Sequence, residues 1–189
     1  MQRIVMLGVA LAAALSIAAV GAGSVSATGH EFVASKTGTT KGKQTDAAVF
    51  KTGAGTLECK NVSSTGSITE LKSAIHRETL TYTACAAFGY SKVKITPVKF
   101  EYSANESARL ETAVTITPEG AGCHITIPAQ TVSGISYENK PSKEITANAN
   151  ASGIVSKGSG EACGSEENSE GSYTGSMTAE LEGGSVEWK

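Results

Sequence analysis

The sequence predicts an all-β fold: a single-domain antiparallel β-sandwich or barrel-like fold with two disulfides, after an N-terminal signal peptide. Three observations support this prediction. Short stretches of alternating apolar and polar residues recur about every ten residues, turn-forming residues separate them, and no long amphipathic helical pattern occurs. Threonine is common at the outward positions of these stretches, which suits the water-facing side of a sheet.

The first 27 residues are typical of a secretory signal peptide. Arg3 gives a short basic start, residues 4–20 are almost entirely apolar, and Val25-Ser26-Ala27 fits the small-x-small cleavage pattern. The alternative is an uncleaved membrane anchor, but the apolar run is short for a span and no basic cluster follows it. We therefore expect a secreted, extracellular protein whose mature part contains no membrane span.

Three segments follow from this division: a signal peptide (1–27), a flexible N-terminal arm (28–46) and a single β domain (47–189). The arm is rich in Gly, Thr, Ser and Lys, and residues 38–43 read as a loop. A short first strand at residues 31–34 is an alternative within the arm. The mature length suits one domain with a substantial core.

Four cysteines lie in the mature region: Cys59, Cys85, Cys123 and Cys163. An even number in an exported chain indicates two disulfides, and no CxxC pair points to a zinc or redox site. Four cysteines allow three pairings. We favour Cys59–Cys85 and Cys123–Cys163, because strands that are neighbours in sequence are usually neighbours in space. The other pairings stay open.

The alternating stretches give the expected strands and their inward faces. In 56–60 Leu57 and Cys59 face the core, and in 172–182 Tyr173, Met177, Ala179 and Leu181 share a face. The inward residues of 144–149 are small. The expected strands within the β domain are 47–51, 56–60, 80–83, 92–95, 113–117, 123–127, 144–149, 172–182 and 185–188.

Residues 67–79 are ambiguous. Ser67 and Glu70 have the spacing of a helical capping box, and Ile68, Leu71 and Ile75 fit a helical stripe. The competing prediction is a strand that continues into 80–83. We favour the strand, because the flanking stretches are strand-like.

No residue pattern indicates a catalytic, cofactor or metal site. His30, His76 and His124 lack paired metal-ligand spacing and are expected at the surface. Residues 156–171 are expected to form a long acidic loop around Cys163. Its glutamates, Glu161, Glu166, Glu167 and Glu170, lack the regular ladder of a calcium-binding loop.

Several motifs around the cysteines carry a resemblance. The chain contains, in this order, the motifs FKTGAGTLECK, YTACAAFGY, a Gly-Cys followed by an Ile/Thr strand, PAQTV, GEACG and YTG. This order of motifs resembles a group of small secreted proteins of soil actinobacteria. The resemblance covers most of the mature chain. It implies export and a disulfide-stapled β fold, and it implies no activity.

These observations favour an exported, non-enzymatic protein: a cell-surface or extracellular module that binds an unidentified ligand or associates with the envelope. The net charge of −2 argues against a nucleic-acid partner. One alternative is a secreted, glycosidase-like hydrolase, which needs two convergent carboxylates such as Glu101, Glu111 or Glu144. A second alternative is a protease inhibitor that uses the turn after Cys85.

Overall fold

The computed structural model describes residues 29–165 and 167–189, and they form the all-β fold that the sequence predicts. Within these ranges the helical element is a 3-10 turn, η1 (Glu161–Cys163). The strands are β1 (Phe32–Ala34), β2 (Gly38–Thr52), β3 (Gly55–Ile68), β4 (Lys72–Ser73), β5 (Ile75–Ala87), β6 (Val93–Ile95), β7 (Val98–Ser103), β8 (Ser107–Leu110), β9 (Val114–Pro118), β10 (His124–Ile127), β11 (Gln130–Ser133), β12 (Ile135–Asn139), β13 (Ile145–Ser159), β14 (Glu167–Leu181) and β15 (Val186–Trp188).

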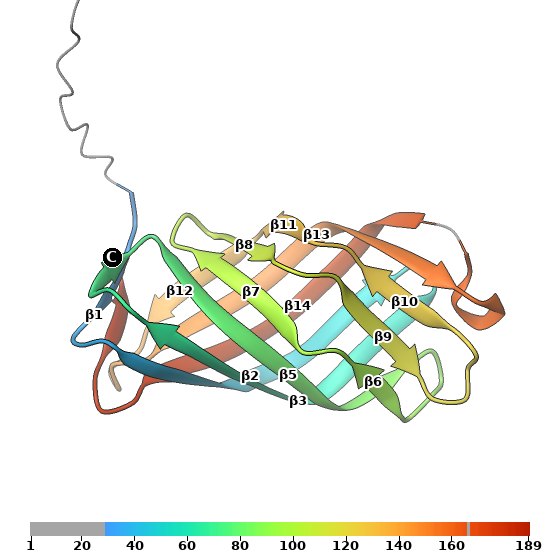
Figure 1. The fold of residues 1–189 in the computed structure, drawn as a ribbon, viewed down its shortest axis with the longest axis horizontal. Coiled ribbons are helices and arrows are strands. Elements are labelled where there is room, and N and C mark those ends of the chain that lie inside the picture. The colour runs from blue at the N-terminus through green and yellow to red at the C-terminus, as the bar shows by residue number, and fades with distance from the viewer. Residues whose placement is uncertain (1–28, 166) are drawn as a thin grey trace, which may run out of the picture.

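One large antiparallel sheet makes up most of the molecule. It has 12 strands, in the order β11-β8-β7-β5-β3-β2-β14-β13-β10-β9-β6, with β12 beside β13. β12 pairs with the first part of β13, whereas β10 pairs with its last part. The long strands β2, β3, β5, β13 and β14 cross the molecule and form its frame (Figure 1).

The large sheet curls into a half-barrel. In Figure 1 β7, β9 and β10 form a near wall that crosses in front of β14 and β2. Bulges interrupt the pairing of β2, β13 and β14, and a bulge increases the local bend and twist of a strand. Gly153 lies at the β13 bulge with φ +71°, a conformation that glycine adopts without steric cost.

A side chain links the edge strand β11 back to β13. The Gln130 Nε2 atom donates to the Val155 carbonyl, and the Val155 N–H donates to Gln130 Oε1, both at 2.9 Å. The amide thus satisfies the same backbone groups that a neighbouring strand would satisfy. Asn150 N also donates to the carbonyl of Gly134, just after β11, at 2.8 Å. The curl therefore encloses an interior.

A small sheet of three strands, β15-β1-β4, lies at the end of the molecule that carries the C-terminus (Figure 1). Its residues Phe32 and Val186 pack with Ile68, Ile145 and Leu181 in a second apolar cluster. The main cluster lies inside the curled sheet. Both ends of the described chain are fixed by pairing, because β1 and β15 are antiparallel partners.

The prediction of a flexible arm over residues 28–46 is wrong, and the alternative of a short first strand is confirmed, because β1 pairs with β15 and β4. Residues 38–46 belong to β2, which pairs with β3 on one side and β14 on the other. Thr40 is 1% exposed there, and Lys41 forms an ion pair with Glu182. The sequence places Gly42 in a predicted loop, but in the structure a Cβ at this position would lie 2.2 Å from Ser64 Oγ. Its glycine permits close approach within the sheet.

Two other local predictions can be compared with the structure. Residues 75–79 belong to β5 and continue into 80–83, so the strand prediction is confirmed for this part. Residues 67–74 are the end of β3, a bend and the short β4, and the capping-box spacing does not produce a helix. The long acidic loop predicted for 156–171 is much shorter. β13 continues to Ser159 and β14 begins at Glu167, because backbone pairing between them persists to Lys157 and Glu167.

The favoured disulfide pairing is confirmed. Cys59 and Cys85 are directly opposite each other on β3 and β5, and their sulfur atoms are bonded. Cys123, just before β10, is bonded to Cys163 in η1. All four side chains are buried, and no free cysteine occurs among the described residues. Cys85 is thus a structural cross-link rather than a reactive thiol.

Candidate functional site

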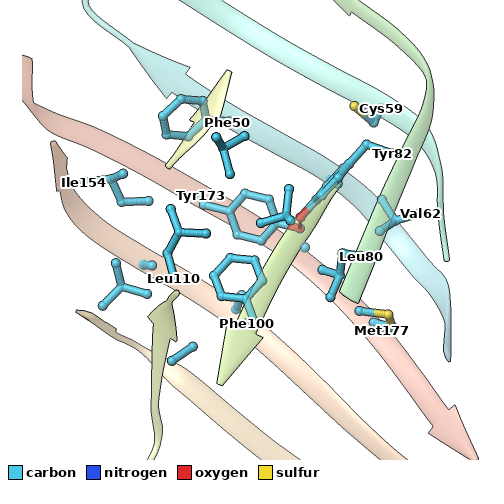
Figure 2. A pocket seen from close by; sticks show the side chains of 18 of the residues that line it. Phe50, Cys59, Val62, Leu80, Tyr82, Phe100, Leu110, Ile154, Tyr173 and Met177 are labelled. Carbon is cyan, nitrogen blue, oxygen red and sulfur yellow. Dashed lines mark hydrogen bonds between the residues drawn. The ribbon is translucent and has the colours of Figure 1, made fainter. Parts of the chain in front are cut away.

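The concave side of the curled sheet encloses a hollow of about 120 Å³ whose lining is almost entirely apolar. Figure 2 shows side chains from strands on both walls pointing into it. Phe50 and Ile154 lie toward one end, and Met177 lies at the opposite end. Most strands of the large sheet contribute at least one lining residue. The hollow is therefore a property of the whole fold rather than of one loop.

Small residues on β13 and β14 create this space. Ala147, Ala149 and Ala151 alternate along β13 onto the inner face, and Ala149 pairs with Gly175 of β14. The facing wall carries larger rings, including Phe100 of β7. Methyl groups and a glycine opposite such rings leave a volume that no side chain fills. The sequence therefore shapes the hollow through residue size on one wall.

Two tyrosine hydroxyls meet inside the hollow. The Oη atoms of Tyr82 and Tyr173 are 3.5 Å apart and point toward each other in Figure 2. Burial raises the pKa of Tyr82 well above 10.0 and also raises the pKa of Tyr173, because an apolar environment disfavours the phenolate. These hydroxyls stay protonated near neutral pH and can each donate or accept a hydrogen bond.

A third polar side chain lies where β2 bulges. The Nε2 atom of Gln44 donates to the carbonyl of Cys59 at 3.2 Å, in the region where the bulge interrupts β2–β3 pairing. The Oε1 atom of the same amide is buried and has no hydrogen-bond partner among the described residues. An unpartnered buried acceptor costs about 1–3 kcal/mol. This polar edge borders an otherwise apolar space.

A smaller chamber of about 30 Å³ adjoins the hollow. Glu78 is 5% exposed there, and its Oε1 atom accepts hydrogen bonds from His76 Nε2 at 3.0 Å and Thr40 Oγ1 at 3.3 Å. The surface position predicted for His76 is therefore wrong, because its ring packs between this carboxylate and Phe32. His30 and His124 are exposed, as predicted.

The hollow and the chamber share three lining residues: Tyr102, Ala147 and Met177. Tyr102 lies between the tyrosine pair and Glu78, and burial followed by the nearby Glu78 charge raises its pKa well above 10.0. Chemically, the combined interior can surround an apolar molecule and offer it hydroxyls and two carboxylates: buried Glu78 at the Met177 end, and Asp46, which borders the hollow from an exposed position of β2. Apolar cavities of about 150 Å³ in other proteins are large enough to bind benzene.

The carboxylates considered for hydrolysis lie elsewhere. Glu101 alternates with Phe100 and Tyr102 on β7, so it points to the outer face of the sheet. It pairs there with Arg77, which also bonds Glu111 at 3.1 Å. Hydrogen bonds from Arg109 and Arg77 lower the pKa of Glu101, whereas a general acid needs a raised pKa. Glu144 bonds Ser142 in a turn.

The remaining candidate sites can also be located. Phe88 and Gly89 form the turn after Cys85, and two backbone hydrogen bonds between Ala87 and Tyr90 close it. Within residues 29–165 and 167–189 no three His, Cys, Asp or Glu side chains gather as metal ligands. Glu166 of the acidic loop lies outside the described residues. No helix in the described part of the chain is long and apolar enough to cross a membrane.

Comparison with family models, curated proteins and solved structures found no match. The resemblance to secreted actinobacterial proteins therefore stays a prediction. Sequence reasoning missed the hollow and the buried Glu78. The available signal was the run of small inward residues at 147–151, which marks a wall without bulky side chains. The order and the curl of the strands determine which residues face that wall. The alternation of apolar and polar residues does not predict either of them.

Proposed function

We propose that the mature chain is an exported, non-enzymatic binding protein that holds one small apolar molecule in the hollow of its curled sheet. This proposal is based mainly on the presence of the apolar hollow. The signal-peptide pattern of residues 1–27 and the two disulfides support action at the cell surface or outside the cell. The apolar lining sets the ligand class, because it provides contact area and few polar partners.

The energetics favour a ligand over a permanently empty space. Protein interiors are normally packed to the density of organic crystals. A hollow lined by apolar atoms leaves some of these packing contacts unmade, and unmade contacts cost free energy. An apolar guest of matching size recovers much of this free energy and transfers its own surface out of water. Toluene is close to the size that the hollow accommodates.

Binding of toluene, measured by isothermal titration calorimetry, tests the proposal. The decisive variant is Ala149→Leu, which places a larger side chain into the hollow from β13. Its matched control is Asn150→Leu, which adds the same side chain at the next, exposed position of β13. We expect toluene to bind the unmodified protein and the control, and to lose measurable binding in Ala149→Leu.

The stability of the variants separates filling from unfolding. Leucine at position 149 should leave the free energy of unfolding within about 1–2 kcal/mol of the parent, because it enters existing space. Equal toluene binding by a folded Ala149→Leu protein and by the parent would show that the hollow is not the binding site. Absence of binding by the unmodified protein would refute the proposed ligand class.

A further inference from the structure

We propose that the natural ligand is an amine: its apolar part occupies the hollow, and its primary ammonium group occupies the small chamber beside Glu78. This inference rests on the proposed function and names the ligand's chemistry. The inference is based on the buried carboxylate of Glu78, which lines the small chamber next to the apolar hollow. Four further features of the chamber argue for an ammonium group rather than another head group.

The first feature is an incompletely used carboxylate. The side chain of Glu78 is 3% exposed, and the hydrogen bonds from His76 and Thr40 both end on Oε1. No hydrogen bond from the described residues ends on Oε2. A carboxylate oxygen in such a position accepts hydrogen bonds only, so it selects a donor.

The second feature is the charge balance of the chamber. Among its described lining residues there is no lysine or arginine, and the titratable neighbours of Glu78 are His76, Tyr102 and Tyr137. Of these only the His76 ring, with Nε2 3.0 Å from Oε1, can pair a positive charge with Glu78, and it does so only when it is protonated. A buried carboxylate is stabilised by a nearby opposite charge and destabilised without one. An ammonium group supplies this charge and three N–H donors. An anionic head group would meet the carboxylate's repulsion.

The third feature is the arrangement of aromatic rings around the carboxylate. Phe32 and Tyr137 meet edge to face with ring centroids 5.1 Å apart, and Phe32 meets His76 at 6.1 Å. Tyr102 completes the lining from β7. Aromatic faces attract ammonium groups, and rings gathered around one space are a common way to bind them. The rings and Glu78 thus favour the same charge.

The fourth feature is size. The chamber has about 30 Å³, and about 10–15 Å³ of such volume holds one water molecule. A primary ammonium group is close to water in size and fits, whereas a quaternary ammonium group is too large. Tyr102, Ala147 and Met177 separate the chamber from the hollow. The linking methylene of the ligand would have to lie between these residues, and the small Ala147 and the flexible Met177 are the side chains that favour this.

A matched series of ligands tests the inference on the full mature chain. Toluene, benzyl alcohol and benzylamine share one ring and differ in the group that would enter the chamber. We expect benzylamine to bind about tenfold or more tightly than benzyl alcohol. In the Glu78→Gln variant this preference should disappear while toluene binding stays. Glu58→Gln is the control, because it removes one charge at an exposed position of β3.

The outcomes distinguish the two proposals. If toluene binds but benzylamine is no better than benzyl alcohol, the amine inference is overturned and the apolar binding function stands. If no member of the series binds, the proposed function fails as well. If the Glu78→Gln variant does not fold, two measurements on the unmodified protein test the amine inference. These are its affinities for the three ligands and the nuclear Overhauser contacts between protein and bound benzylamine. The benzylamine methylene must then contact the Tyr137 or Tyr102 ring; contacts confined to the Phe50 end would overturn the inference.

Discussion

Single residues determine how polar the interior is. Tyr82, Tyr102 and Tyr173 each retain some accessible surface, yet burial raises all three pKa values. Both observations are consistent with rings that border an enclosed space instead of bulk water. Glu78 is the one carboxylate in the lining of the small chamber. The interior is therefore apolar over most of its surface, with hydroxyls in the middle and the buried Glu78 carboxyl at one end, whereas Asp46 borders the hollow from an exposed position.

Alkaline pH should destabilise the protein through these tyrosines. Their folded-state pKa values lie above the unfolded value of about 10, so their contribution to stability is complete below pH 10 and is lost as pH rises above it. Each such tyrosine lowers the free energy of unfolding by about 1.4 kcal/mol per pH unit in that window. Tyr82→Phe should therefore show a shallower decline in urea unfolding between pH 10 and 11.5. Parallel declines would contradict the burial of Tyr82.

Close approach between strands depends on particular glycines. A Cβ on Gly66 of β3 would lie 2.4 Å from the backbone oxygen of Arg77 on β5, and backbone atoms cannot move aside without disturbing the pairing. We expect Gly66→Ala to lower the free energy of unfolding by about 1–3 kcal/mol. Urea unfolding monitored by Trp188 fluorescence measures this change.

The matched control for this substitution is Gly53→Ala. Its added Cβ would meet the Asn168 side-chain amide at 2.6 Å, and that amide can rotate away. Its effect should be clearly smaller than the effect of Gly66→Ala. Equal destabilisation by the two substitutions would mean that the β3–β5 approach is looser than the structure shows.

The disulfides act on the scale of elements. They close loops of 26 and 40 residues, and on the chain-entropy model each contributes about 3–4 kcal/mol. Replacing Cys59 and Cys85 together by alanine should lower the melting temperature markedly, and the Cys123/Cys163 pair should behave similarly. Calorimetry with and without reductant measures the effect. An unchanged melting curve in reductant would show that the cross-links do not stabilise the fold.

Local patterns predicted many elements but not their lengths. Residues 80–83, 123–127 and 172–182 alternate clearly, and strands occur there. The strands continue beyond these stretches because cross-strand pairing overrides weak local signals such as the glycines in 38–43. β7 and β8 were not identified, although Phe100 and Leu110 both line the hollow. Sheet order and curl bring distant residues together, and alternation does not encode them.

At the scale of the molecule, one curled sheet creates both spaces. Strands from β2 to β14 contribute to the lining, so the site forms only when sequence-distant strands have paired. The Gln130–Val155 contact joins β11 to β13, and the small sheet contributes Phe32 and Val186 to the lining of the chamber. A binding site made in this way depends on the intact fold. Ligand binding and global stability should therefore be linked, because a guest that binds only the folded chain stabilises it.

A crystal structure of the protein grown with iodobenzene can show directly whether the hollow binds an apolar molecule, because iodine gives an anomalous signal that locates the guest. We expect an iodine peak inside the curled sheet, with the ring in contact with Phe100, Leu110 and Tyr173. An interior without density while iodobenzene occupies only surface positions would contradict the claim that the hollow is a binding site.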